Sequence, residues 1–395
     1  MDIFTPFRLI FNNISGLYNY FTINDKNTNR QPRLFIDISE VHIHDNGTGV
    51  PRVTNGIRNH LSKFDLPYEV VEVYAKPHNQ GFFAVSTNKP IKVSKNDFFF
   101  GLDFSKFLIP QNKRHIFKFR RIGMPVFFFL HDLILLFPTS YRNHADEIFK
   151  KWIDVIKQCD GFIANSKSTQ DEMLAWLKKQ PKKSYNNQIK YGYIHLGTSF
   201  SPKNFIPTIN KTNKHQFLAV GTVGARKRYD QIVAAFDILW KNGYDVSLQI
   251  VGKPGGKENA AVFNQIHNNS QYGKNLIWHE NFITDEQLGN LYGDSVALIF
   301  ASELEGFGLP LIEAATYGKP IIARDIPIFR EVTNNEAFFF KGNEPNDLAT
   351  AIKDWIYLYQ QGKITSPKIK LYSWEESTKE TIDILFGNKT PKFQA

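Results

Sequence analysis

Short apolar runs alternate with amphipathic helical patterns along most of this 395-residue chain. The run VFFFL at Val126–Leu130 predicts a buried strand, and Tyr229–Lys241 places large apolar side chains on one helical face. Such alternation predicts parallel sheets covered by helices, which is an α/β fold. The other predicted strands are Leu34–Asp37, Tyr68–Tyr74, Gly81–Val85, Phe98–Leu102, Gly161–Ala164, Phe217–Gly221, Val246–Val251, Val296–Phe300 and Pro320–Ala323. The other predicted helices are Val50–Leu61, Ile148–Ile156, Ser168–Lys178 and Pro310–Tyr317.

The alternation occurs in two blocks, which predicts two Rossmann-like parallel-sheet domains at residues 31–200 and 217–372. A polar, proline-containing stretch at 201–216 separates them and is the expected linker. Residues 1–30, aromatic and then polar, are expected to be an N-terminal appendage. Ligands of such domains bind beyond the carboxyl ends of the strands, so we expect the chemistry in the loops that follow the strands.

Charge and cysteine content narrow the classes of partner. Lys and Arg number 48 against 38 Asp and Glu, and the net charge of +10 favours anionic partners such as nucleotides, phosphates, acidic lipid surfaces or nucleic acid. The single cysteine, Cys159, excludes an internal disulfide framework and a cysteine-based zinc site and favours a reducing compartment. No apolar stretch of about 20 residues is present, and the N-terminus lacks the pattern of a signal peptide. We therefore expect no membrane-spanning segment.

A basic turn follows the first strand of the second block. In TVGARKRYD, Gly221 and Gly224 allow the backbone to turn, and Arg226 and Lys227 stand at the mouth of the next helix. Two fixed cations beside a helix N-terminus form an anion site that suits a diphosphate. The alternative is a tight turn followed by solvated basic residues. Gly252, just before the turn KPGGKEN, is a candidate to line a base or ribose, or belongs to an ordinary turn.

Two glutamates frame the loop SELEGFGLPLIEAAT of the second block. Glu305 lies in the loop and is a candidate to hold sugar hydroxyls, whereas Glu313 falls in the next helix, where its carboxylate suits the vicinal hydroxyls of a ribose. Backbone N–H groups between them precede a helix N-terminus and form a cradle for a negatively charged or hydroxylated ligand. These groups belong to Gly306, Phe307, Gly308 and Leu309. The alternative is that one glutamate is an ordinary N-terminal helix charge.

These segments resemble the retaining GT-B glycosyltransferases of family 4, with Glu305 and Glu313 as their Glu-x7-Glu motif. The likeness runs from Val220 to about Ile384. VGTVGARKRYDQIVAAF resembles the strand, Arg-Lys pair and helix of the family, and the stretch from NFITDEQL to IFREV matches it nearly throughout. SWEESTKETIDIL resembles the closing helix, so residues 373–395 are expected to form a C-terminal helix that crosses back to the first domain, and a tail.

The resemblance implies a role for each matching residue. Arg226 and Lys227 are implied to hold the donor diphosphate and to stabilise it as the leaving group. Glu305 is implied to position the donor sugar, assisted by the amides of residues 306–308. Glu313 is implied to bind the ribose, and Leu309 is a candidate contact of the ribose or phosphate region.

The chain departs from the family at two places in the basic turn. Ala225 stands where the family often has Pro, and Arg228 where it usually has Asn or a small residue, and both departures are expected to alter the turn while leaving the cation pair. No DxD-like acidic pair stands in a suitable loop, so neither a metal nor a cofactor is expected, and fixed cations and helix dipoles would stabilise the departing diphosphate. In the family's usual mechanism the donor's own phosphate oxygen takes the acceptor proton on the same face, without a protein nucleophile.

The first block also carries candidate site residues, which would face the second block across a cleft between the two domains. Gly47, Thr48 and Gly49 precede a helix, where a flexible loop would meet the donor phosphates or else form a surface turn. IDISEVHIHDNGTGVPRV resembles the DxSE…GTGxxRV start of bacterial members that build O-antigen and capsule polysaccharides, many of them mannosyl- or rhamnosyltransferases. That likeness makes GDP-mannose the first choice of donor.

A histidine follows the strand VFFFL directly. His131 and Asp132 stand at its carboxyl end, which favours a functional histidine over a buried structural one. The position resembles the His-Asp of the family, where the histidine contacts the donor sugar or phosphate, and Asp132 is a candidate to orient it or the acceptor. Asn165, after the strand GFIA, is expected near the cleft as a supporting residue.

A basic and aromatic run, NKRHIFKFRR, is a candidate membrane-binding patch. Basic residues are attracted to anionic lipid and aromatic ones insert at the interface. The patch residues are Lys113, Arg114, Phe117, Lys118, Phe119, Arg120 and Arg121. The alternative is a solvated face with a few core aromatics. With this patch, we expect a cytoplasmic protein, peripheral on the inner face of the membrane, whose partners are a nucleotide sugar and a glycan or lipid-linked glycan, and not nucleic acid.

Three other functions compete with glycosyl transfer. A retaining glycoside hydrolase would use two carboxylates about 5–5.5 Å apart, but it would leave the cations Arg226 and Lys227 unexplained. A nucleotide-sugar epimerase shares the two-domain fold and needs no acceptor. A non-enzymatic module that binds anionic surfaces would carry its cations as a patch rather than in a cleft.

Overall fold

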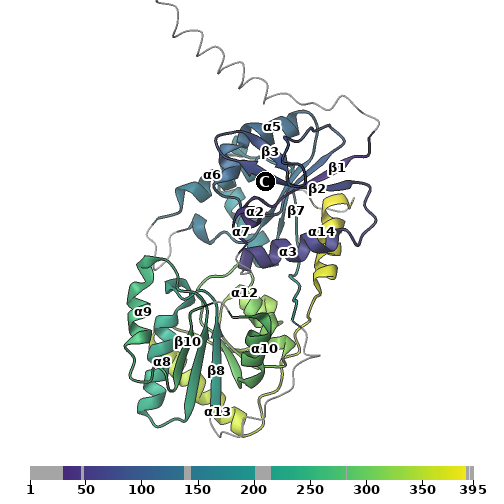
Figure 1. The fold of residues 1–395 in the computed structure, drawn as a ribbon. Coiled ribbons are helices and arrows are strands. Elements are labelled where there is room, and N and C mark those ends of the chain that lie inside the picture. The colour runs from purple at the N-terminus through teal and green to yellow at the C-terminus, as the bar shows by residue number, and fades with distance from the viewer. Residues whose placement is uncertain are drawn as a thin grey trace, which may run out of the picture.

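The computed structural model describes residues 30–45, 49–137, 144–200, 215–281, 283–387 and 391, which form two domains (Figure 1). Within these residues, seven strands form the sheet of the first domain in the order β3-β2-β1-β4-β5-β6-β7, and β3 alone runs antiparallel to its neighbour. The strands are β1 (Arg33–Asp37), β2 (Glu69–Lys76), β3 (Gly81–Ala84), β4 (Phe98–Gly101), β5 (Val126–Leu130), β6 (Gly161–Ala164) and β7 (Lys190–Tyr193). The helices are α2 (Ser39–Ile43), α3 (Gly49–Leu61), α4 (Leu108–Gln111), α5 (Lys113–Arg121), α6 (Glu147–Ile156) and α7 (Lys167–Lys178), with 3-10 turns at Ile134–Leu136 and Lys182–Ser184.

The second domain is built around a parallel sheet whose described strands have the order β10-β9-β8-β11-β12-β13. These strands are β8 (His215–Val220), β9 (Val246–Val251), β10 (Leu276–His279), β11 (Ala297–Phe300), β12 (Ile321–Arg324) and β13 (Phe338–Phe340). The helices are α8 (Tyr229–Lys241), α9 (Ala260–His267), α10 (Asp285–Asp294), α11 (Leu309–Thr316), α12 (Pro327–Val332) and α13 (Pro345–Gln360), with 3-10 turns at Ala225–Lys227 and Lys257–Asn259. Helix α14 (Trp374–Phe386) follows them in the chain. The α/β, two-sheet GT-B class expected from the sequence is confirmed.

Strand β5 shows why phenylalanine runs form these sheets. All five of its residues are buried. Phe127 and Phe129 point into the core shared with α3, whereas Phe128 and Leu130 point into the core on the opposite face, shared with α6. A parallel strand covered by helices on both faces needs apolar side chains at every position, which the pattern VFFFL supplies.

In both sheets the strand order reverses beside the first strand of the block. Strand β1 lies between β2 and β4, and β8 lies between β9 and β11. The connections that leave the carboxyl ends of such neighbouring strands run to opposite sides, which opens a crevice for a ligand. The predicted residues of the second domain lie in the turns after β8, β9 and β11 and in α11.

The chain returns to the first domain at its last described helix. Figure 1 shows α14 beside α3, away from the sheet of the second domain. Lys63 pairs with Glu375 at 3.1 Å, and the hydroxyl of Thr378 donates to the carbonyl oxygen of Ile57 at 3.4 Å. Helix α14 therefore packs on the first domain.

The predicted boundaries of the appendage and the linker lie mostly outside the described residues. Residues 1–29 and 201–214 lie outside the described residues, so the N-terminal appendage and most of the predicted linker stay predictions. Strand β8 begins at His215, so residues 215 and 216 belong to the strand and not to the linker as predicted. Within the described part of the chain, no helix combines the length and apolarity needed to cross a bilayer.

The contact between α3 and α14 leaves no room for a side chain at Gly56. A Cβ atom on Gly56 would lie 2.3 Å from a ring carbon of Trp374. We expect Gly56→Ala to lower the free energy of unfolding by about 1–3 kcal/mol, because overpacking outweighs the gain in helix propensity. Urea denaturation measures this. The matched control is Asn59→Ala, at an exposed position of α3, which should leave the midpoint nearly unchanged. An unchanged midpoint for Gly56→Ala would contradict the described packing.

Candidate functional site

The turns after β8 and β9 lie directly against each other. Gly221 has φ 137° and Gly252 has φ 155°, conformations that other residues rarely adopt. A Cβ on Gly252 would lie 2.0 Å from the carbonyl oxygen of Gly221, and one on Gly221 would lie 3.2 Å from Cε of Lys227. The hydroxyl of Tyr229, at the start of α8, donates to the same carbonyl at 2.9 Å. Both glycines are therefore required for the close approach of backbone and lysine at this edge of the sheet.

The two predicted cations and the loop glutamate form one buried ion cluster. Nη1 of Arg226 lies 2.8 Å from Oε1 of Glu305, and Nζ of Lys227 contacts the same oxygen. Arg226 also donates to the carbonyl oxygen of Leu304 at 2.6 Å. The side chains of Lys227 and Glu305 are only 12% and 10% exposed. The cluster stands at the carboxyl ends of β8 and β11, where the sequence predicted an anion site.

The charge states in this cluster follow from burial and pairing. Burial would raise the pKa of Glu305, but Arg226 and then Lys227 outweigh it and hold the pKa at about 2. Burial lowers the pKa of Lys227, and the charge of Glu305 opposes that change. Two cations and one carboxylate therefore meet in a largely buried setting, which suits an anionic ligand.

Glu313, in α11, accepts hydrogen bonds from two sides. Oε2 accepts from the hydroxyl of Tyr292 at 2.7 Å, and Oε1 accepts from Nη1 of Arg52 at 3.1 Å. Burial raises the pKa of Glu313, while Arg52 and the Tyr292 hydroxyl lower it. Nη2 of Arg52 also contacts Oδ1 of Asp285 at 2.7 Å. Because Arg52 lies on α3, this ion pair links the two domains.

Arg52 is the site residue that the sequence analysis did not assign. It stands in GTGVPRV, whose likeness to GTGxxRV was noted, but only the Gly-Thr-Gly part was given a role. Gly47 and Thr48 lie outside the described residues, and Gly49 opens α3 with φ 35°. The roles predicted for these three residues stay predictions.

Gly306 brings the loop of the second domain onto the first. A Cβ there would lie 1.9 Å from the carbonyl oxygen of His131 and 3.0 Å from Nδ2 of Asn165. The carbonyl oxygen of Gly306 accepts from the hydroxyls of Ser166 at 2.8 Å and Thr169 at 3.2 Å. Glycine is therefore required for this contact with the carboxyl ends of β5 and β6.

A second contact fixes the same face of the two domains. The carboxylate of Glu331, in α12, accepts from the backbone N–H groups of Lys167 at 2.7 Å and Ser168 at 2.8 Å. It also accepts from the hydroxyl of Ser168 at 2.6 Å. These donors lie at the N-terminus of α7, whose dipole favours a carboxylate.

The loop after Glu305 places the remaining predicted residues. Gly308 has φ 104° and directly precedes α11, which begins at Leu309. Phe307 is buried in the core, so its side chain is not available to a ligand, although its backbone remains in the cradle. The left-handed conformation explains why glycine stands before this helix.

His131 is buried and neutral. Its side chain lies among Phe129 and Phe104, and Nε2 donates to the carbonyl oxygen of Leu102 at 3.1 Å. Burial lowers the pKa of His131 to about 4, so the ring is uncharged near neutral pH. Since Nε2 carries the proton, Nδ1 is the acceptor nitrogen.

Asp132 and Asn165 support the backbone of this region. Oδ1 of Asp132 accepts from the backbone N–H of Ile134 at 3.0 Å, which closes the turn after β5. Nδ2 of Asn165 donates to the carbonyl oxygen of His131 at 2.6 Å. Asn165 thus fixes the backbone of the residue after β5.

Arg228 shows how the chain accommodates its departure from the family pattern. It has φ 53°, a left-handed conformation that asparagine adopts more readily than arginine. Its guanidinium contacts Glu303 at 2.6 Å and Asp230 at 3.2 Å. These ion pairs hold Arg228 beside the cation pair without displacing it.

The candidate membrane patch is helix α5, and the burial of Phe119 contradicts the membrane role predicted for that residue. Phe119 is 4% exposed and packs against Phe82 and Phe99, so it cannot insert into a membrane. Arg120 pairs with Asp160 at 3.0 Å. Phe117 is half-buried against the same core. The exposed basic residues are Lys113, Arg114 and Arg121, and Lys118 is half-buried.

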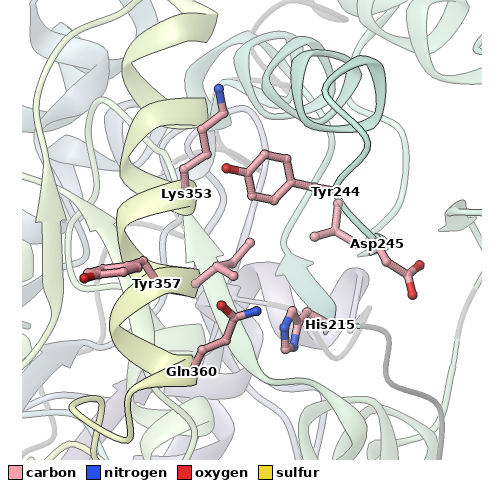
Figure 2. A pocket seen from close by; sticks show the side chains of 8 residues that line it. His215, Tyr244, Asp245, Lys353, Tyr357 and Gln360 are labelled. Atoms are coloured by element: carbon pink, nitrogen blue, oxygen red, sulfur yellow. The ribbon is translucent and has the colours of Figure 1, made fainter.

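A pocket of about 270 Å³ lies away from these residues (Figure 2). It lies at the amino ends of β8 and β9 and against α13, at the opposite edge of the sheet from Gly221 and Gly252. Its lining includes His215, Lys353 and Tyr357 and none of the predicted site residues. Within the described residues, no group of three His, Cys, Asp or Glu side chains is placed to hold a metal ion.

Known proteins share parts of this sequence. The family described as glycosyl transferases group 1 matches residues 201–364. A serotype-specific mannosyltransferase WbdA of Escherichia coli is 33% identical over 380 residues, and the match covers 87% of this chain and 44% of that protein. The chain therefore spans less than half the length of this relative. An O-antigen chain mannosyltransferase RfbU of Salmonella typhimurium is 26% identical over 200 residues, which are 50% of this chain and 52% of that protein.

Solved structures share the fold. A trehalose-6-phosphate synthase, OtsA, superimposes with a TM-score of 0.64 at 11% identity, over 91% of this chain and 100% of that one. A UDP-forming α,α-trehalose-phosphate synthase from Burkholderia xenovorans gives a TM-score of 0.58 at 11% identity, over 90% and 95% of the two chains. Such low identity establishes the architecture alone. Residues 201–364 therefore match the glycosyl transferases group 1 family, and the described part of the chain has the two-domain GT-B fold.

Proposed function

We propose that this chain transfers a hexose from a nucleoside-diphosphate sugar to a hydroxyl of a bacterial surface glycan, with retained anomeric configuration and without a metal. The observation that carries the proposal is the buried cluster of Arg226, Lys227 and Glu305 at the carboxyl ends of β8 and β11. Mannose from GDP-mannose is the proposed donor, because the first block resembles mannosyltransferases and relatives of this chain carry that description.

Binding of a diphosphate would exchange partners within this cluster. The phosphate oxygens would take over the positive charge of Arg226 and Lys227, which releases the Glu305 carboxylate toward the hydroxyls of the donor sugar. Fixed cations in a poorly hydrated site stabilise the charge that develops on a leaving group. Glu313 would accept hydrogen bonds from the ribose.

In the transfer step the bond between the anomeric carbon and the diphosphate breaks as the acceptor oxygen attacks the same face. The acceptor proton passes to the departing phosphate oxygen, so atoms and charge balance without a protein nucleophile. The neutral His131 would accept a hydrogen bond from a sugar hydroxyl through Nδ1. The contact of Gly306 with the first domain would keep water out of the site.

The partners of Glu305 argue against the glycoside hydrolase alternative. A retaining hydrolase needs a carboxylate that is available to attack the sugar as the nucleophile. Oε1 of Glu305 is instead held by Arg226 and Lys227, and these two cations would have no role in such a reaction. An epimerase would be distinguished from a glycosyltransferase by its product, because it forms a new nucleotide sugar and leaves an acceptor unchanged.

The test of the proposal is a transfer assay with the purified chain, GDP-mannose and a synthetic mannosyl acceptor, with and without EDTA. We expect the acceptor to gain one hexose in an α linkage, as the donor has, at the same rate in both buffers. Transfer from another nucleotide sugar would support hexosyl transfer but reject GDP-mannose as the donor. No transfer from GDP-, UDP-, dTDP- or ADP-sugars would reject the function.

The ion cluster predicts a large loss of turnover when one member is removed. Lys227→Ala and Glu305→Gln should each lower kcat by about 10²–10³, the usual effect of deleting a group that stabilises the transition state. Lys241→Ala is the control, because Lys241 lies at the far end of α8 and is exposed. Steady-state kinetics on variants with wild-type circular dichroism measure the effect. A kcat within threefold of wild type for Lys227→Ala would contradict the diphosphate role.

We propose further that the basic residues of α5 outside the ion pair of Arg120 with Asp160 hold the protein on an anionic membrane by charge alone. Changing Lys113, Arg114, Lys118 and Arg121 together to Gln should weaken binding to phosphatidylserine vesicles by at least about 100-fold, at about 1 kcal/mol per residue. Cosedimentation measures this. The control is an equal charge change in the same domain, at the exposed residues Lys178, Lys179, Lys182 and Lys183. Equal losses in both variants would reject α5 as the binding patch.

A further inference from the structure

One arginine of the first domain reaches the carboxylate that is proposed to bind ribose in the second. Nη1 of Arg52 donates to Oε1 of Glu313 at 3.1 Å, while Nη2 contacts Oδ1 of Asp285 at 2.7 Å. The guanidinium also lies over the ring of Phe200, 5.2 Å from its centroid. The side chain of Arg52 is 20% exposed, and that of Glu313 is 7% exposed. The planar guanidinium group of Arg52 therefore connects α3 with α10 and α11.

Glu313 keeps acceptor capacity after these contacts. An ionised carboxylate offers about four lone-pair sites, two on each oxygen. Arg52 uses one on Oε1, and the hydroxyl of Tyr292 uses one on Oε2. The remaining site on each oxygen matches the two vicinal hydroxyls of a ribose. Arg52 and Tyr292 thus fix the orientation of the carboxylate without exhausting it.

The aromatic residues around the ion pair of Arg52 and Glu313 reduce its exposure to water. The ring of Tyr292 is stacked on that of Tyr317, with centroids 5.7 Å apart, and Phe200 packs edge-on against both rings. Charge-assisted hydrogen bonds are stronger where water is excluded. The Glu313 carboxylate is therefore held on one oxygen by Tyr292 of its own domain and on the other by Arg52 of the first domain.

We propose that Arg52 is a positioning residue of the donor site, which orients the Glu313 carboxylate for ribose from the opposite domain and so couples ribose binding to domain closure. This inference rests on the proposed function, because it takes Glu313 as the ribose-binding group. A lysine at this position is not equivalent, since an ammonium group has no fixed fork to hold Glu313 and Asp285 in one geometry.

The charge of Glu313 also depends on Arg52. Burial raises the pKa of Glu313 and Arg52 opposes that rise, so loss of the guanidinium makes the carboxyl titrate at higher pH. A protonated carboxyl has less acceptor capacity for ribose. The charged and titratable groups that face Glu313 are Arg52, Asp285, Tyr292, Tyr317 and Lys227.

The first test is calorimetric titration of GDP into wild-type protein and variants at pH 6, 7 and 8. Arg52→Ala should weaken GDP binding at least about tenfold at pH 7, the loss of roughly one pKa unit of interaction, and more at pH 6 than at pH 8. Arg52→Lys should recover part of the affinity. Arg58→Ala is the control, because Arg58 lies on the same helix and pairs with Glu72 at 3.9 Å. Wild-type or tighter GDP binding by Arg52→Ala would overturn the proposal.

The second test needs no nucleotide. Burial of Glu313 without Arg52 costs more stability as the pH rises above the unfolded-state pKa of 4.5, because the buried group must ionise. The loss of stability caused by Arg52→Ala, measured by urea unfolding, should therefore grow from pH 5 to pH 8. It should become independent of pH when Glu313→Gln is already present. A loss that is equal at all pH values in both backgrounds would overturn the coupling, whereas failure of wild-type protein to bind GDP would reject only the proposed donor.

Discussion

The buried carboxylate of Glu305 and its two cations hold the carboxyl ends of two neighbouring strands of the second domain together. Arg226 and Lys227 come from the turn after β8, and Glu305 comes from the loop after β11, so one shared oxygen joins two neighbouring strand ends. Removing a partner from such a buried cluster leaves an uncompensated charge, which is far more costly than losing an exposed ion pair. In the proposed function, a donor diphosphate takes the place of Glu305 as the partner of both cations.

The second constraint is the close approach of the domains. Gly306 lies against the carbonyl of His131 where no side chain fits, and Arg52 crosses to Glu313. Residues of both domains therefore build one site, and the helix α14 on the first domain keeps the two halves connected. A loop glycine of the second domain and an arginine of the first thus both lie at this contact.

The sequence correctly predicted those strands and turns that depend on the local pattern of residues. Continuous apolar runs located β5, β6 and β9 to the residue, and glycine with paired cations located the turn after β8. Prediction from the sequence failed where contacts in the folded chain determine which side chains are buried or paired. In α5, residues Ile116 and Phe119 share one helical face and enter the core, but the composition of the run suggested a membrane patch. Arg52 was missed because its partners, Glu313 and Asp285, lie more than 200 residues away in the chain.

The most direct measurement is calorimetric titration of wild-type protein and the double variant Arg226→Ala/Lys227→Ala with GDP, UDP, dTDP and ADP in the presence of EDTA. The account predicts that one nucleoside diphosphate binds the wild-type protein in EDTA. It predicts that the double variant, still folded, loses at least about 100-fold in affinity for that nucleotide, because two charge-assisted contacts are gone. Equal binding by both proteins, or no binding of any nucleotide by folded wild-type protein, would contradict the assignment of this ion cluster to the donor diphosphate.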